Sequence, residues 1–350
     1  MKWRVPSLHP ALAAALALGG CESVGPVALQ RDRLDYVEAL AESGKRESLL
    51  NVVRLKHGDV PAFVSVSTIV GAYTVRGELE VLGGVIEALG FENDVGARAL
   101  VLGADRPTVT YSPLRGGDLA SYLLQPIRPA ELLSVVESST RVELALLLGV
   151  AGFHGVTNDV VPCTAAAPER SRFAQVVRLI SFLQGRGGFG LMWREEAQGE
   201  RRLHLVFNTP PENPRTVEAV DELKALLDLP RDRDTFAVTY GRPTRPDEIA
   251  ILSRTVLQML TLVGARPAHA RTDAARAACL GAPRLIDLRF GPRPPADAYA
   301  AVPYEGRWWW IAEDDAASKA AFTFLQVLMA LALTGGGDES LLLTVPTGGG

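Results

Sequence analysis

The spacing of apolar residues along the chain changes several times, and each change predicts a different element. Between residues 31 and 55 apolar residues recur at helical spacing, and cations followed by Gly58 are typical of a helix end. Residues 62–75 and 78–84 are rich in β-branched residues and predict strands. Residues 97–113 predict a hairpin that turns at Ala104, Asp105 and Arg106.

The second half shows the same mixture. The unbroken apolar run of residues 142–150 predicts a strand covered on both faces. Residues 244–264 predict a helix, because Thr, Pro, Asp and Glu crowd its start and an apolar stripe follows. Residues 300–313 predict a hairpin turning at Glu305–Gly306, and the nearly all-apolar residues 318–333 predict a buried or interface helix.

This order of elements lacks strict strand–helix–strand alternation. It therefore predicts an α+β fold, with mixed, largely antiparallel sheets packed with amphipathic helices. At 350 residues the chain is long enough for one large or two medium domains. The Ala- and Pro-containing residues 161–171 predict a linker or long loop between an N-terminal domain (31–160) and a C-terminal domain (172–346).

The first twenty residues follow the pattern of a secretory signal peptide. Lys2 and Arg4 supply positive charge, and Ala11–Leu18 is an apolar run of eight residues, followed by small residues. A membrane-spanning helix needs about twenty apolar residues, so this run does not suffice as an anchor.

The following residues, Leu18-Gly19-Gly20-Cys21, resemble the lipobox of bacterial lipoproteins. The resemblance implies that the sulfur of Cys21 takes a diacylglyceryl group, that the signal is cut just before Cys21, and that the new amino end is acylated, for example with palmitate. It also implies a lipidated tether over residues 21–30. In such proteins an Asp directly after the cysteine often causes retention in the inner membrane. Residue 22 is Glu and not Asp, which favours a location in the outer membrane, facing the periplasm. The alternative is an Ala-rich segment with a chance cysteine. Residues 49–63 and 306–331 also resemble uncharacterised bacterial lipoproteins, which implies no activity.

The charge balance argues against nucleic acid as a partner. The net charge is −4, and removing residues 1–21 leaves 34 basic and 40 acidic residues, hence −6. Phosphate backbones need the opposite charge. The two other cysteines, Cys163 and Cys279, would form a disulfide in an oxidising compartment. The alternative is two buried, unpaired thiols.

Motifs that would carry chemistry are weak. Residues 185–190 (GRGGFG) match a dinucleotide pattern by letter, but a predicted helix precedes them and a strand follows, the reverse of what the motif requires. No phosphate loop or metal-ligand spacing is present, so no cofactor or metal is predicted. His154 lies between Gly152 and Gly155 and close to Asp159 in the sequence, which makes it a weak catalytic candidate. The competing interpretation is a histidine that only forms hydrogen bonds within its loop. His204 is predicted on the polar face of a strand.

Trp308, Trp309 and Trp310 form an unusual run. On a strand Trp308 and Trp310 share a face and Trp309 points to the opposite face. At least one indole would therefore be exposed to solvent unless both faces of the strand are covered. An exposed indole suits recognition of a sugar, protein or lipid headgroup. The competing interpretation is that the helix over residues 318–333 and a second layer bury both faces.

Two functions remain open at this stage. The first is a membrane-anchored envelope lipoprotein with a non-catalytic scaffold or binding role toward a protein or cell-wall partner. The second is an anchored hydrolase acting on envelope glycan, peptide or lipid, with a dispersed site near His154 and Asp159. The absence of motifs favours the first and leans against an enzyme.

Overall fold

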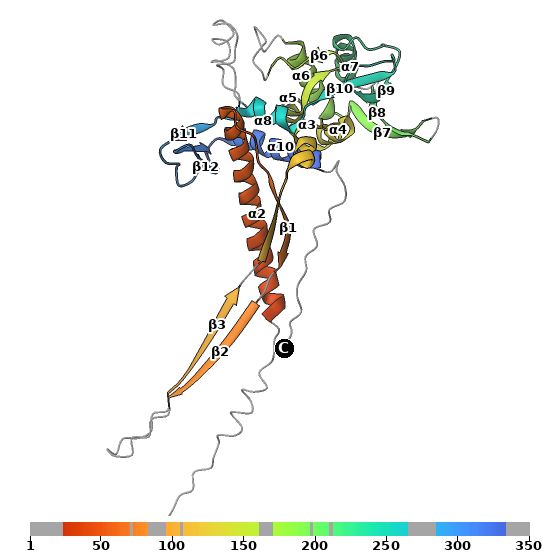
Figure 1. Ribbon diagram of the computed structural model, residues 1–350. Coiled ribbons are helices and arrows are strands. Elements are labelled where there is room, and N and C mark those ends of the chain that lie inside the picture. Colours follow the sequence, from red (N-terminus) through yellow and green to blue (C-terminus); the bar gives the residue numbers. More distant parts are fainter. Residues whose placement is uncertain are drawn as a thin grey trace, which may run out of the picture. The chain divides into compact units, whose positions relative to one another are not determined.

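Figure 1 shows the computed structural model of the chain. The structure describes residues 24–70, 73–82, 96–105, 108–160, 171–196, 199–209, 213–264 and 285–333. The chain divides into two compact units, Met1–Ser48 and Leu49–Gly350. Helices and strands are mixed, and most strand pairs are antiparallel, which confirms the predicted α+β class.

The first described element is a long helix, α2 (Val24–His57). It starts within the predicted tether and passes through Gly44 without a break. Its last turn carries Arg54, Lys56 and His57, and Gly58 follows with φ 92°. Cations and a left-handed glycine are the expected signals for a helix end, so this end was predicted correctly.

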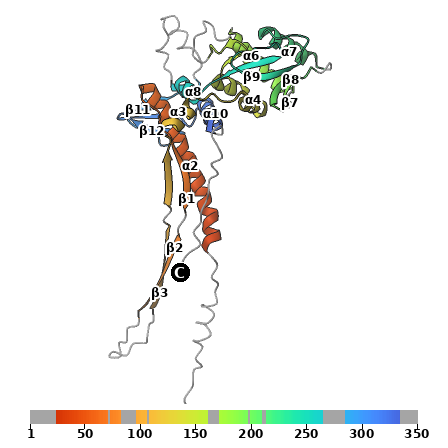
Figure 2. The same ribbon diagram turned by 45° about the vertical axis from the view of Figure 1, so that its right-hand side comes forward.

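Four strands then form two two-stranded sheets: β1 (Val64–Val70), β2 (Tyr73–Leu82), β3 (Gly96–Asp105) and β4 (Thr108–Pro113). β1 pairs with β4 and β2 with β3, both antiparallel, as both views show (Figures 1 and 2). The predicted hairpin at residues 104–106 is wrong, because β3 pairs with β2 and β4 pairs with β1. Residues around Asp105 look like a turn locally, whereas the pairing is decided by partners thirty or more residues away.

The largest sheet has six strands in the order β6-β5-β10-β9-β8-β7. Their bounds are β5 (Val150–Phe153), β6 (Val156–Thr157), β7 (Phe189–Glu195), β8 (Arg201–Phe207), β9 (Thr235–Tyr240) and β10 (Glu248–Ser253). Only β9 and β10 run parallel among these strand pairs. The sheet takes strands from both sides of residues 161–171, so the predicted linker does not separate two sheets.

Short helices surround this sheet and share one apolar core with it. They are α3 (Gly116–Leu124), α4 (Pro129–Ser138), α5 (Val142–Gly149), α6 (Arg172–Gln184), α7 (Pro214–Leu226) and α8 (Val256–Gly264). α4 packs on β7, β9 and β10, and α6 packs on α5 and α7. The core includes fully buried Phe153, Phe173 and Phe236.

Two predicted elements have the wrong type. Residues 142–149 form α5 and not a strand; an apolar run of this length does not distinguish the two, and the helix is buried on most of its sides. The predicted helix over 244–264 is strand β10 followed by α8. Ile249, Ala250 and Ile251 are each 0% exposed, so pairing within the sheet overrides the local helix-start signals.

The true start of α8 has its own capping signal. The amide of Gln258 donates to Thr255 Oγ1 at 3.2 Å, and the amide of Thr255 donates to Gln258 Oε1 at 3.0 Å. This is a capping box, in which two otherwise unpaired amides are satisfied reciprocally. Thr255 and Gln258 have the spacing of a capping box in the sequence, so the start of α8 could have been predicted there. The sequence analysis instead placed the helix start at the polar residues 244–248.

A smaller sheet, in the order β11-β13-β12, and a last helix complete the described fold. The elements are β11 (Arg289–Gly291), β12 (Ala300–Tyr304), β13 (Arg307–Ile311) and α10 (Ala316–Leu333). The predicted turn is confirmed: Glu305 and Gly306 both have positive φ, as a type I′ hairpin requires. In the described residues α10 is the one helix long and apolar enough to cross a membrane by length and composition, yet its Phe322, Leu325 and Leu328 lie fully within the core.

Candidate functional site

A cleft that contains His154 lies where three loops meet at the edge of the large sheet. Its volume is about 460 Å³. The β5–β6 turn, the segment after α7 and the β9–β10 loop supply its lining residues: His154, Asp228, Leu229, Pro230, Pro243, Thr244, Arg245 and Pro246. The three prolines restrict the backbone of two of these loops, so the walls are stiff.

His154 occupies the first position of a two-residue turn between β5 and β6. Its φ is 45° and that of Gly155 is 84°, a type I′ geometry in which Asn, Asp or Gly is the usual residue at the first position. The His154 amide donates to the Ala250 carbonyl at 2.6 Å, and the Ala250 amide donates to His154 Nδ1 at 3.2 Å. Because Nδ1 accepts this bond, the neutral ring carries its proton on Nε2 and presents a donor there.

The electrostatics keep this ring neutral. Burial lowers the pKa of His154, and the nearby Asp228 carboxylate opposes this effect without cancelling it. Asp228 itself follows α7 with φ 54° and lies 3.5 Å from Arg172 Nη2. Among the described residues, two of the three non-glycine positions with positive φ therefore line one cleft. Backbone strain of this kind concentrates at functional sites, which is why this cleft is the leading candidate.

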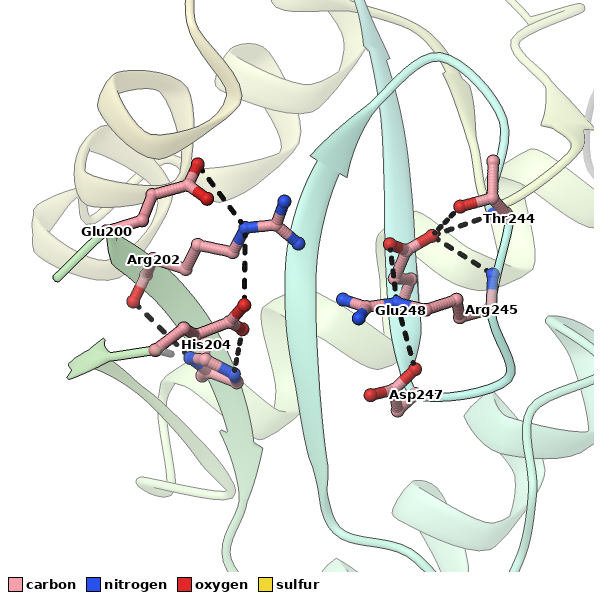
Figure 3. A network of polar contacts seen from close by, with 8 residues as sticks. Glu200, Arg202, His204, Thr244, Arg245, Asp247 and Glu248 are labelled. Carbon is pink, nitrogen blue, oxygen red and sulfur yellow. Dashed lines mark hydrogen bonds and ion pairs between the residues drawn. The ribbon is translucent and has the colours of Figure 1, made fainter. Parts of the chain in front are cut away.

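Arg245 is held in the third loop by a buried carboxylate (Figure 3). Glu248 is 5% exposed and accepts hydrogen bonds from the Thr244 amide at 2.7 Å, the Thr244 hydroxyl at 3.0 Å, and Arg245 Nε at 3.2 Å. Burial alone would raise the pKa of Glu248, but the bonds from Thr244 and Arg245 outweigh it, and the pKa lies below its ordinary value. The carboxylate thus fixes the loop, and Arg245, which lines the cleft, has its Nε held against Glu248 and at 3.5 Å from Asp247.

A second polar network, also in Figure 3, lies on β8 and does not line the cleft. Arg202 Nε is 3.6 Å from both Glu196 and Glu200, and His204 Nε2 is 3.7 Å from Glu196. His204 lies on the face of β8 opposite Leu203 and Leu205, as predicted, and its contacts are polar, but it is only 8% exposed. The ring is covered and lies beside a carboxylate.

The other sequence candidates lie away from the cleft or outside the described residues. Asp159 accepts a hydrogen bond from the Ser171 hydroxyl and does not line the cleft with His154. Cys21, Cys163 and Cys279 lie outside the described residues, so neither the lipid attachment nor the disulfide is addressed. The sequence analysis missed Asp228 and Arg245. Nothing in their local sequence shows that their loops meet the turn of His154, which lies more than seventy residues earlier in the chain.

The tryptophan run follows the predicted alternation. Trp309 is 3% exposed and packs against Phe290 and His57, with ring centroids 5.0 and 5.2 Å away. Trp308 and Trp310 are half-buried, and the ring of Trp310 covers Gly291 so closely that a Cβ there would lie 3.1 Å away. The middle indole is therefore a core residue, and only its two neighbours retain surface for a ligand.

Three polar side-chain types meet at the cleft. The cleft combines the Nε2 donor of His154, the guanidinium of Arg245 and the carboxylate of Asp228, and its walls contain three prolines. In the described part of the chain no three His, Cys, Asp or Glu residues are grouped to hold a metal. No family model, curated protein or solved structure matches the chain.

Proposed function

We propose that this chain is a lipid-anchored lipoprotein of the cell envelope that binds a protein or cell-wall partner without catalysing a reaction. The observation that carries the proposal is Leu18-Gly19-Gly20-Cys21, placed directly after a charged start and a short apolar run. The thiol is the nucleophile that lipid transfer requires, and several acyl chains exceed what stable anchoring needs. The outer membrane, facing the periplasm, is the proposed location.

Anchoring is tested by metabolic labelling with a palmitate analogue, followed by membrane fractionation. The wild-type chain should carry label and sediment with membranes, and Cys21→Ser should lose both properties. Cys279→Ser is the matched control, because it removes a thiol outside the lipobox and should retain label. Equal labelling of all three chains would count against the anchor.

The proposed binding site is the cleft of His154, Asp228 and Arg245. Its polar groups, the Nε2 donor of His154 with Asp228 and Arg245, which are each paired within the chain, suit the hydrogen-bonding groups of a peptide-like ligand. Prolines in the walls limit the loss of loop entropy on binding. Catalysis is disfavoured because His154 Nδ1 accepts the Ala250 amide and its Nε2 is a donor, which is not the arrangement of a general base.

Binding is tested with a photo-crosslinking amino acid at Pro243, on the cleft, in intact cells. An adduct with an envelope component is expected there, and not with the same probe at exposed Asp118 on α3. His154→Asn should remove most of the adduct while preserving the turn, since Asn suits the first type I′ position. Equal adducts at both probe sites would contradict the assignment of the cleft.

The alternative is an anchored hydrolase of envelope glycan, peptide or lipid that uses His154 and Asp159. It predicts turnover by the purified chain that is lost in His154→Ala. No contact of either residue favours it over the binding role.

A further inference from the structure

The side chain of His154 takes part in the main-chain pairing of the large sheet. Two opposite residues of an antiparallel pair usually exchange N–H···O bonds between their backbones. At the end of β5 the His154 amide donates to the Ala250 carbonyl at 2.6 Å, whereas the Ala250 amide donates to His154 Nδ1 at 3.2 Å. The chain turns at His154 with a φ of 45°, so the imidazole nitrogen supplies the acceptor that the carbonyl of a continuing strand would supply.

A protonated imidazole does not keep this bond. Both ring nitrogens of a charged histidine carry a proton, so Nδ1 would face the Ala250 amide as a second donor. Ala250 is 0% exposed, and a buried amide needs a partner, so the end of the sheet has to rearrange once the ring is charged. Burial lowers the pKa of His154 below 6.5, so the bond is complete at neutral pH and is lost as the pH falls through the lowered pKa.

The charged groups around the ring come from the two other loops of the cleft. The carboxylate of Asp228, after α7, raises the pKa of the ring against the larger effect of burial and lies 3.5 Å from Arg172 Nη2 of α6. Arg245, in the β9–β10 loop, has its Nε 3.2 Å from Glu248 and 3.5 Å from Asp247. The Asp228 side chain is 86% exposed, against 39% for Asp247 and 6% for Glu248. Asp228 is therefore the carboxylate that a charged ring leaving the sheet can approach without further loss of solvent.

The strand that loses the bond also holds the third loop of the cleft. Ala250 lies two residues after Glu248 on β10, and Glu248 fixes the β9–β10 loop by accepting from the Thr244 amide and hydroxyl. Ala250 thus joins the turn of His154 to that loop through one strand. We propose that protonation of His154 releases the Ala250 amide, turns the ring toward Asp228 and opens the cleft in mild acid. Loss of the bound partner in acid rests on the proposed function, whereas release of the amide does not.

Hydrogen–deuterium exchange of the full-length chain, extracted in detergent, tests the release directly. Mass spectrometry follows peptides that contain Ala250, and each measured rate is compared with the intrinsic rate at the same pH. From neutral pH into mild acid the wild-type peptide should lose most of its protection, while peptides from α5 keep theirs. His154→Asn should show no such change, because the Asn carbonyl accepts the Ala250 amide without titrating and Asn suits the turn. Unchanged protection in the wild type, or the same acid change in His154→Asn, would overturn the proposal.

Asp228→Asn distinguishes this switch from a general loosening in acid. Asn is compatible with the φ of 54° at this position, so the segment after α7 keeps its conformation. Without the carboxylate the pKa of the ring falls further, and the change in protection at Ala250 should move to lower pH. A change that stays at the same pH, or moves to higher pH, would count against the pairing of the ring with Asp228 and hence against the switch.

Partner binding is followed separately with the photo-crosslinking probe at Pro243, in isolated membranes. An adduct that is present at neutral pH and absent in mild acid is the expected result. Equal adducts at both pH values would contradict the opening of the cleft. No adduct at either pH would contradict the proposed function, and the exchange measurements would still decide the release of the amide.

Discussion

Replacing Arg254 with methionine should destabilise the body of the protein, because this guanidinium caps a buried helix end. Arg254 is 5% exposed and lies between β10 and α8. Its Nη1 donates to the carbonyls of Leu147 at 2.6 Å and Leu148 at 3.1 Å, in the last turn of α5. The last carbonyls of a helix have no partner within it and lie at the negative end of its dipole, so a cation is favoured there.

The expected size of the effect follows from two opposing contributions. Hydrogen bonds from a charged donor contribute about 1.5–3 kcal/mol each, so the two bonds contribute about 3–6 kcal/mol. Burial lowers the pKa of Arg254 from 12.5 to about 10, which at about 1.4 kcal/mol for each tenfold change is a cost of about 3 kcal/mol. The guanidinium therefore remains charged at neutral pH, and the two contributions leave about 0–3 kcal/mol. Because methionine also leaves two buried carbonyls without a donor, Arg254→Met should lower the free energy of unfolding by about 1–3 kcal/mol.

Arg254→Lys should be at least as harmful as Arg254→Met. An ammonium group retains the cost of burying a charge, and its compact shape does not reproduce the fork that reaches two successive carbonyls. The exposed Arg242→Met is the control and should change stability by less than about 0.5 kcal/mol.

Urea unfolding followed by circular dichroism, with linear extrapolation to water, measures all four chains. An Arg254→Met variant as stable as the wild type, or a Lys variant more stable than the Met variant, would refute the capping role.

Three further changes test other parts of the structure. Asn51→Ala leaves the Ala62 amide and carbonyl without their buried partner and should cost about 2–3 kcal/mol in urea unfolding. Asp315 caps α10 by accepting from the Ser318 hydroxyl and amide, which lowers the pKa of Asp315 below 3.8; Asp315→Ala should cost about 1 kcal/mol at neutral pH. Because the folded pKa is the lower one, this contribution is present above pH 3.8 and is lost as the pH falls through the lowered pKa, so the difference in thermal midpoint should vanish in acid. Glu305→Asn, at a φ of 47°, should raise the thermal midpoint, since Asn tolerates the left-handed region better than Glu; a lower midpoint would contradict the turn assignment.

Elements whose ends are marked by local chemistry were predictable from the sequence. The turn at Glu305–Gly306 needs only residues compatible with positive φ between two strands. Asp315, the last of three acidic residues directly before α10, caps the N-terminus of that helix. The end of α2 at His57 was likewise marked by cations and a glycine.

Elements decided by distant partners were not predictable in this way. Residues 248–253 follow helix-start signals, but pairing with β9 and β5 makes them a strand. The hairpin predicted at Asp105 was wrong because the partner of Asp105 in its sheet is Tyr73, which lies 32 residues earlier in the chain. The cleft combines His154 with Asp228 and Arg245 from loops more than seventy residues further along the chain. Of these three, only His154 attracted notice in the sequence.

The proposal of a lipid-anchored envelope protein is tested most directly by mass spectrometry of the N-terminal peptide from the chain purified out of membranes. We expect a peptide that begins at Cys21 and carries acyl chains on its sulfur and its amino group. An unmodified peptide that begins at Met1 would contradict the anchor and the envelope location together.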